Sequence, residues 1–251
     1  MRVLSRDEAQ VLPVSTVTTS APLRRSANPW KRRAAGIASE SPSERIRRQS
    51  CLLLNKLASQ NFGSISTHII DLSAECLAQV LDLVLDKACD EHQYSALFAR
   101  LVRRLADRHP AITCPDEVLS IERICTRRLH ESQNTLESMR KWKPIMFSDA
   151  YYSLQKARRH YFGLIIFIVE LYKTELVDKS FLYDCAVRMR PAQQDLAEYR
   201  VEATCRFLTH LLALKLPIED LLVPLQSHSS TILPVRLKCM IEDICDAATQ
   251  P

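Results

Sequence analysis

The residues that could do chemistry in this sequence are its cysteines, histidines and glycines, and their spacing points away from a catalytic or metal site. The nine cysteines include no C-x-x-C pair, and the seven histidines show no H-x3-5-H spacing, which argues against zinc. The three glycines, Gly36, Gly63 and Gly163, are too far apart to form a phosphate-binding loop. The motifs G-x-S-x-G and H-E-x-x-H are absent as well. We therefore predict a protein that is not an enzyme, with reduced structural cysteines, no metal and no cofactor.

A basic segment precedes the part of the chain that could form a core. Residues 1–50 hold ten Lys or Arg against four Asp or Glu, a charge of +6, whereas the rest of the chain is at −1. Residues 1–40 show no apolar periodicity, so we expect a flexible basic arm. Its one large apolar side chain, Trp30, is typical of an interface anchor, although a solvated tail is the alternative. The longest apolar run, residues 161–169, is too short to span a membrane, and we expect a soluble, cytoplasmic protein.

Scarce glycine, twelve prolines and many leucines and alanines predict an all-α fold. Ser41, Pro42 and Glu44 have the spacing of a helix start with a capping box. Apolar residues, Val118 among them, then recur at helical spacing, and the second half of residues 149–173 is apolar on all sides, as in a buried central helix. The expected helices are residues 42–57, 59–72, 73–89, 94–107, 116–139, 149–173, 178–189, 194–214, 217–225 and 231–247.

Ten helices form five pairs of about 40 residues, close to the period of HEAT repeats. We therefore expect one domain over residues 41–251, built as a stack of helix pairs, with a compact irregular bundle as the alternative. Five ordered blocks of this domain resemble the middle domain of eukaryotic translation initiation factor 4 gamma. They are the L-N-K-L and N-F segments at residues 54–62, the helices at 83–91 and 94–105, the R-R-x-x-x-G-x-x-x-F segment at 158–173, and shorter matches at 184–187, 205–209 and 235–237.

The resemblance implies a right-handed stack of HEAT-like helix pairs that performs no chemistry itself. It implies binding to the DEAD-box RNA helicase of translation initiation, of the initiation factor 4A type, and stimulation of that helicase. The arm tryptophan and the polar corners between helices would contact the two helicase lobes. The residues assigned to this contact are Trp30, Asn55, Lys56, Asn61, Phe62, Glu91 and Tyr94. The alternative interpretation is structural, with Lys56 complementing a helix dipole and Phe62 buried in the core.

Two basic rows on expected helices could follow the phosphate backbone of RNA. They consist of Arg100, Arg103 and Arg104 on one helix and of Lys156, Arg158 and Arg159 on another. Solvated basic helix faces have the same spacing and are the alternative. The Tyr-x-x-x-x-Leu motif of cap-binding-protein recruitment is absent, since none of the seven tyrosines has a leucine five positions later. A related adaptor of messenger-RNA metabolism, of the poly(A)-binding-protein-interacting or nonsense-decay type, is the second functional hypothesis, and an unrelated repeat adaptor is the third.

Overall fold

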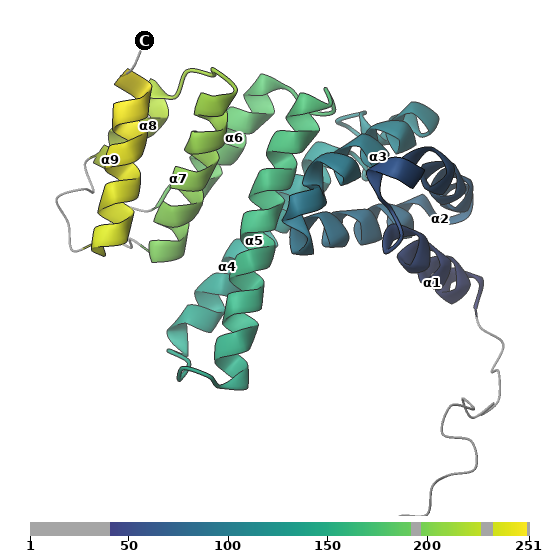
Figure 1. Cartoon of the computed structure of the whole chain (residues 1–251), viewed down its shortest axis with the longest axis horizontal. Coiled ribbons are helices and arrows are strands. Elements are labelled where there is room, and N and C mark those ends of the chain that lie inside the picture. Colours follow the sequence, from purple (N-terminus) through teal and green to yellow (C-terminus); the bar gives the residue numbers. More distant parts are fainter. Residues whose placement is uncertain (1–40, 192–196, 227–232, 250–251) are drawn as a thin grey trace, which may run out of the picture. The chain divides into compact units, whose positions relative to one another are not determined.

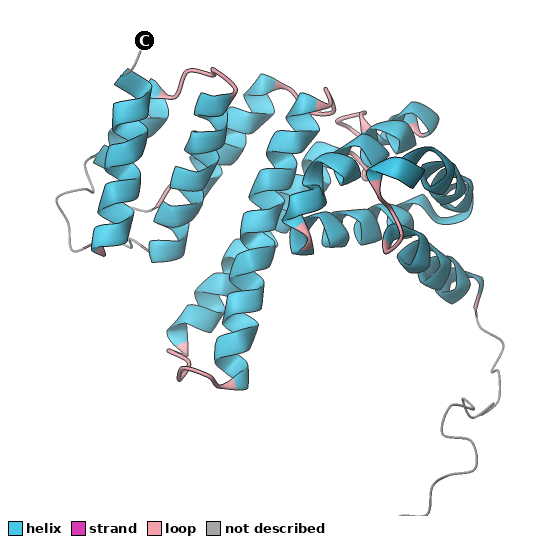
Figure 2. Cartoon of the chain, viewed as in Figure 1, coloured by secondary structure: helices cyan, strands magenta, loops and turns pink. Residues whose placement is uncertain are grey.

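The computed structural model describes residues 41–191, 197–226 and 233–249, so Trp30 and the expected arm lie outside the described residues. Within these ranges the chain forms α-helices joined by turns and short 3-10 segments, and no strand occurs (Figures 1 and 2). This confirms the all-α prediction. The helices are α1 (Pro42–Leu54), α2 (Phe62–Asp90), α3 (Ser95–Arg108), α4 (Ile121–Lys141), α5 (Asp149–Lys173), α6 (Lys179–Met189), α7 (Glu198–Ala213), α8 (Glu219–Gln226) and α9 (Val235–Thr249).

The start of α1 is fixed by the predicted capping box. The Ser41 hydroxyl accepts a hydrogen bond from the Glu44 amide at 3.2 Å, and the Glu44 carboxylate accepts one from the Ser41 amide at 3.0 Å. Both groups satisfy amides that the first turn of a helix leaves without a backbone partner. Helix α5 begins and ends at the predicted residues, and Ser148 caps it by accepting from the Tyr151 amide.

Helix α2 joins the two helices predicted at residues 59–72 and 73–89, with a sharp bend at Cys76, where φ is −154° and ψ is 68°. The predicted boundary at Ser73 is therefore three residues early. The Ser73 hydroxyl donates to the Ile70 carbonyl at 2.6 Å instead of capping a new helix. Both segments of α2 pack on α3. In the first segment, Ser73 Oγ lies 2.8 Å from Nε2 of His109, the residue after α3, and in the second, the Ala88 carbonyl accepts from Ser95 Oγ at 3.3 Å.

The helix predicted to begin at Asp116 begins at Ile121 instead. The five residues before it form turns, in which the Glu117 amide donates to the Cys114 carbonyl and the Ser120 amide donates to the Glu117 carbonyl. Val118 is 79% exposed, so its expected place in the buried stripe is wrong. Helical spacing alone placed Val118 in the stripe, but the turn after Pro115 takes that segment out of the helix.

Helix α5 is the central element of the described stack. It packs against α2, α3, α4, α6 and α7, whereas the remaining contacts join helices near one another in sequence, such as α1 with α2 and α8 with α9. Its second half is buried, as predicted, and includes Tyr161, Phe167 and Leu171. Gly163 permits the contact with α2, because a Cβ atom there would lie 1.9 Å from the Cys89 carbonyl oxygen. None of the described helices is long and apolar enough to cross a bilayer.

Candidate protein and RNA interfaces

The corner between α1 and α2 holds four of the residues assigned to helicase binding. Asn55 and Lys56 are exposed. Asn61 instead ties the corner together, since its side chain accepts from the Ala58 amide and donates to the Lys56 carbonyl, both at 2.7 Å. Phe62 is only 8% exposed and lies under the Arg100 guanidinium, whose carbon is 4.5 Å from the ring centroid. Phe62 is therefore buried, as the alternative interpretation expected, whereas the exposed Asn55 and Lys56 are available to a partner.

The corner between α2 and α3 holds Glu91 and Tyr94. Glu91 forms an ion pair with Lys87, with Oε1 of Glu91 2.6 Å from Nζ of Lys87, and Tyr94 is 49% exposed. Arg100, which covers Phe62, follows Tyr94 by six residues on α3, or about 9 Å of helix axis. Arg100 thus links the Phe62 corner to the helix that follows Tyr94, and we treat both corners as candidate protein-binding surfaces. We call Asn55, Lys56 and Tyr94 the exposed rim.

The basic row on α3 is used largely within the protein. Arg100 covers Phe62, and Arg104 donates to the Ser66 hydroxyl and to the Gly63 carbonyl. Arg103 pairs with Asp107 at 3.2 Å and donates to the Glu175 carbonyl at 3.3 Å. These contacts hold α3 to α2 and to the loop after α5. Part of the charge predicted to meet RNA is therefore committed to packing.

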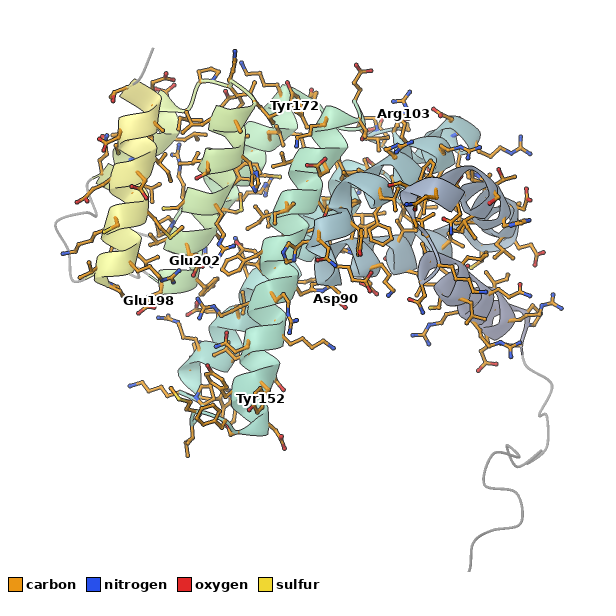
Figure 3. All side chains as sticks on the ribbon, viewed as in Figure 1. Asp90, Arg103, Tyr152, Tyr172, Glu198 and Glu202 are labelled. Atoms are coloured by element: carbon orange, nitrogen blue, oxygen red, sulfur yellow. The ribbon has the colours of Figure 1, made fainter. Side chains whose placement is uncertain are left out.

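The basic row on α5 opens onto a pocket that the sequence did not reveal. A hollow of about 460 Å³ is lined by side chains of α5, α7 and α9, and we call it the arginine pocket. Buried Glu202 on α7 lies in it, with Glu198 one turn earlier on the same helix (Figure 3). Lys156 is exposed on α5 but lines a separate hollow, together with Asp86, Asp90 and Glu131. The residues of the pocket that carry charge or an aromatic ring are His92, Arg158, Arg159, Phe162, Glu202, Arg206 and Arg236.

Three arginines converge on the two oxygens of Glu202. One oxygen accepts from Arg206 Nε at 3.2 Å and Nη2 at 2.8 Å, and the other accepts from Arg158 at 3.0 Å and from Arg236 at 2.8 Å. Burial by itself raises the pKa of Glu202, but the hydrogen bonds from Arg236 and Arg206 outweigh it and lower the pKa to about 2. Glu202 is therefore a carboxylate at neutral pH and links α5, α7 and α9.

The sequence indicates Arg158 and Arg159 as candidate site residues, but it does not indicate Arg206, Arg236 or Glu202. The nearest signal was Arg206 four residues after Glu202, which is the spacing of a helix ion pair. Nothing in the sequence connects Arg236 with Arg158, which lies 78 positions earlier.

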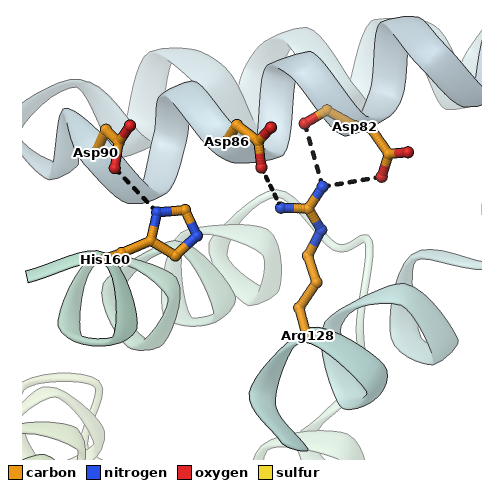
Figure 4. A network of polar contacts seen from close by, with 5 residues as sticks. All are labelled: Asp82, Asp86, Asp90, Arg128 and His160. Carbon is orange, nitrogen blue, oxygen red and sulfur yellow. Dashed lines mark hydrogen bonds and ion pairs between the residues drawn. The ribbon is translucent and has the colours of Figure 1, made fainter. Parts of the chain in front are cut away.

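A second polar network joins α2 to α4 and α5 (Figure 4). Asp82, Asp86 and Asp90 form one row along α2. Arg128 of α4 donates to Asp82 at 2.8 Å and to Asp86 at 2.5 Å, and His160 of α5 lies 2.9 Å from Asp90. This network crosses between helix pairs and fixes their packing.

The loop between α4 and α5 exposes a group of large apolar side chains. Trp142, Ile145, Met146 and Phe147 are 63–82% exposed. Phe147 and Lys143 adopt positive φ values of 67° and 40°, which are uncommon for residues other than glycine. These residues fall between the helices expected at residues 116–139 and 149–173.

Several cysteines of the protein are buried. All nine cysteines are free, and burial raises the pKa of Cys89, Cys185 and Cys205 to about 12. At neutral pH these groups stay protonated. Among the described residues no group of three or more His, Cys, Asp or Glu side chains could hold a metal ion.

Comparison with known proteins places this architecture in a family. The chain is 27% identical over 231 residues to the eukaryotic translation initiation factor 4 gamma of Schizosaccharomyces pombe, covering 78% of this chain and 16% of that protein. It is 26% identical to the eukaryotic initiation factor 4F subunit p130 of Saccharomyces cerevisiae, covering 91% of this chain and 29% of that protein. It is also 26% identical to the human eukaryotic translation initiation factor 4 gamma 3, covering 81% and 14%.

The chain thus spans less than a third of the length of these relatives. The model of the MIF4G domain matches residues 48–248, which include every described helix from the middle of α1 into α9. The helices, their pairing and the resemblance of the five sequence blocks agree with this match, and the chain belongs to the MIF4G domain family.

Proposed function

We propose that this chain is a scaffold of translation initiation, working in the cytoplasm, that binds a DEAD-box RNA helicase of the initiation factor 4A type and RNA. The observation that carries the proposal is the MIF4G match over residues 48–248, together with relatives named as initiation factors 4 gamma. A scaffold of this kind acts through the positions of its partners.

The exposed rim and the arm tryptophan are the surfaces we assign to the helicase. Tyr94 is a half-exposed aromatic side chain, and such groups are frequent among the residues that dominate binding energy at interfaces. Lys56 and Asn55 offer a charge and an amide at the corner between α1 and α2. Contact with both helicase lobes would favour their closed arrangement, and a population shift of this kind raises ATPase turnover without a catalytic residue on the scaffold.

The test is a pull-down and an ATPase assay with purified helicase, with and without RNA. We expect binding and raised turnover, which Tyr94→Ala and Trp30→Ala should each reduce, by about tenfold in Kd for a side chain worth 1.4 kcal/mol. The matched controls are Tyr152→Ala and Trp142→Ala, which remove exposed aromatic residues from the α4–α5 region. If the rim and arm variants behave like their controls, the assigned surfaces are wrong. If the unaltered chain binds no helicase, the function belongs to the messenger-RNA adaptor class.

A further inference from the structure

The arginine pocket carries an excess of positive charge in a confined space. Its lining places four guanidinium groups, those of Arg158, Arg159, Arg206 and Arg236, against the single carboxylate of Glu202. The excess is three positive charges, and the neighbouring Glu198, which acts on Arg236, reduces it to two. Concentrated charge of one sign in a hollow attracts a ligand of the opposite sign. The pocket therefore suits an anion.

The arginines are held in place and still have donors to offer. A guanidinium group has five N–H donors, and the bonds to Glu202 use one from Arg158, one from Arg236 and two from Arg206. Arg206 is also fixed over the Phe162 ring, with its guanidinium carbon 4.6 Å from the centroid. Glu202, only 4% exposed, thus acts as a positioning residue that sets the arginines before a ligand arrives. Arginine forks match the oxygens of phosphate better than lysine does.

The surroundings favour a chain of phosphates over a single one. Arg159 is exposed at the edge of the pocket, whereas Lys156, three residues earlier on α5, lines a separate hollow together with Asp86, Asp90 and Glu131. The positive charge of the pocket thus reaches its exposed edge at Arg159. Phe162 and Ile166 add apolar surface to the lining, against which a ribose or base can pack. A phosphorylated side chain would use the pocket but leave this exposed edge empty.

We propose that the arginine pocket, formed by α5, α7 and α9, is the site that binds the phosphate backbone of RNA, with Glu202 as its organiser. The proposal rests on the RNA-binding part of the proposed function and names the site for it. It differs from the sequence-based expectation because it moves the contact from the α3 row to α7 and α9. Arg206 and Arg236 become RNA ligands, and Arg100, Arg103 and Arg104 hold the fold.

The test measures binding of a short unstructured fluorescent RNA by anisotropy over a range of salt concentrations. We expect Arg236→Gln and Arg159→Gln each to lower the slope of log Kd against log salt by about 0.7, the value for one contact to a single strand. Relative to 1 M salt this corresponds to about a fivefold weaker Kd at 0.1 M. The matched control is Arg127→Gln, an exposed arginine of α4 outside the pocket lining, which should retain the original slope. Arg159 has no contact that folding requires among the described residues, so its variant remains informative if Arg236→Gln is unstable.

The outcomes separate this proposal from the broader one. If the unaltered chain binds RNA and both pocket variants keep its affinity and slope, the pocket assignment is wrong and RNA binding stands. If Arg100→Gln instead causes the loss, the site lies on α3. If the unaltered chain binds a phosphoserine peptide but no RNA, a phosphoprotein occupies the pocket, and the RNA part of the proposed function fails while helicase binding is still judged by the pull-down.

Discussion

Replacing Gly163 with alanine should destabilise the protein, although alanine is the better helix former. A Cβ atom at this position would lie 1.9 Å from the Cys89 carbonyl oxygen, 2.7 Å from its carbon and 2.9 Å from the Cys89 Cα. Ordinary contact begins near 3.4 Å, so α5 and the end of α2 would have to move apart by about 1.5 Å. All three obstructing atoms belong to the backbone, and no side-chain rotation can relieve the overlap.

The size of the effect follows from two opposing contributions. Overpacking in a core costs about 1–3 kcal/mol, and the rigid backbone places Gly163→Ala at the upper end of that range. Alanine returns about 1 kcal/mol through helix propensity. The net loss is about 2 kcal/mol, or a fall in Tm of about 4–8 °C for a domain of this size.

The assay is thermal and urea unfolding followed by circular dichroism, with Gly63→Ala as the matched control. Gly63 lies in the first turn of α2 with no atom within 4 Å of its would-be Cβ, so alanine there should stabilise by about 0.5–1 kcal/mol. The two substitutions are chemically identical and should act in opposite directions. A Gly163→Ala protein as stable as the original would refute the close approach of α5 and α2.

Three further predictions concern charge and reactivity. Because the pKa of Glu202 is lowered to about 2, its stabilising effect is present above about pH 4.5 and is lost as the pH falls toward 2. Glu202→Gln should therefore lower the urea midpoint at pH 7 and make the midpoint fall less steeply below pH 4.5. Equally steep falls in the variant and the original protein would contradict this role. Arg128→Ala should lower the free energy of unfolding by about 1.5–3 kcal/mol, since it leaves Asp82 and Asp86 without their shared cation, whereas Arg127→Ala should change it little. Brief treatment of the native protein with a maleimide should modify the exposed thiols of Cys114 and Cys239, as detected by mass spectrometry. The buried thiols should stay unmodified, and early modification of any of them would contradict the packing; they are Cys89, Cys125, Cys185 and Cys205.

Much of the fold was predictable because its signals are local. The capping box at Ser41 and Glu44 and the long apolar run of α5 each depend on residues within a few turns, and the structure confirms both. The bend at Cys76 lacks a local signal, since neither glycine nor proline occurs in α2 near it. The two α2 segments on either side of the bend both contact α3 or the residue that follows it. Contacts between helices cannot be read from the spacing of apolar residues within one helix.

The candidate sites were predictable only in part, for the same reason. Exposed corner residues such as Lys56 and Tyr94 follow from the ends of helices and can be found from the sequence. Phe62 has the same polar neighbours in sequence, yet Arg100 covers it from another helix. The arginine pocket gathers side chains from three helices around one carboxylate. These side chains meet because the three helices pack together, and their spacing in the sequence does not indicate it.

The position of α5 has a consequence for how the domain opens. In an ideal solenoid each repeat touches only its neighbours, and the ends can unravel one repeat at a time. Helix α5 belongs to a middle pair and contacts the pairs on both sides of it, from α2 to α7, so its loss would expose the core on both sides at once. We therefore expect the backbone amides of α5 to exchange with deuterium only in global unfolding, and a fragment cut between α5 and α6 to expose the apolar α5 surface and aggregate.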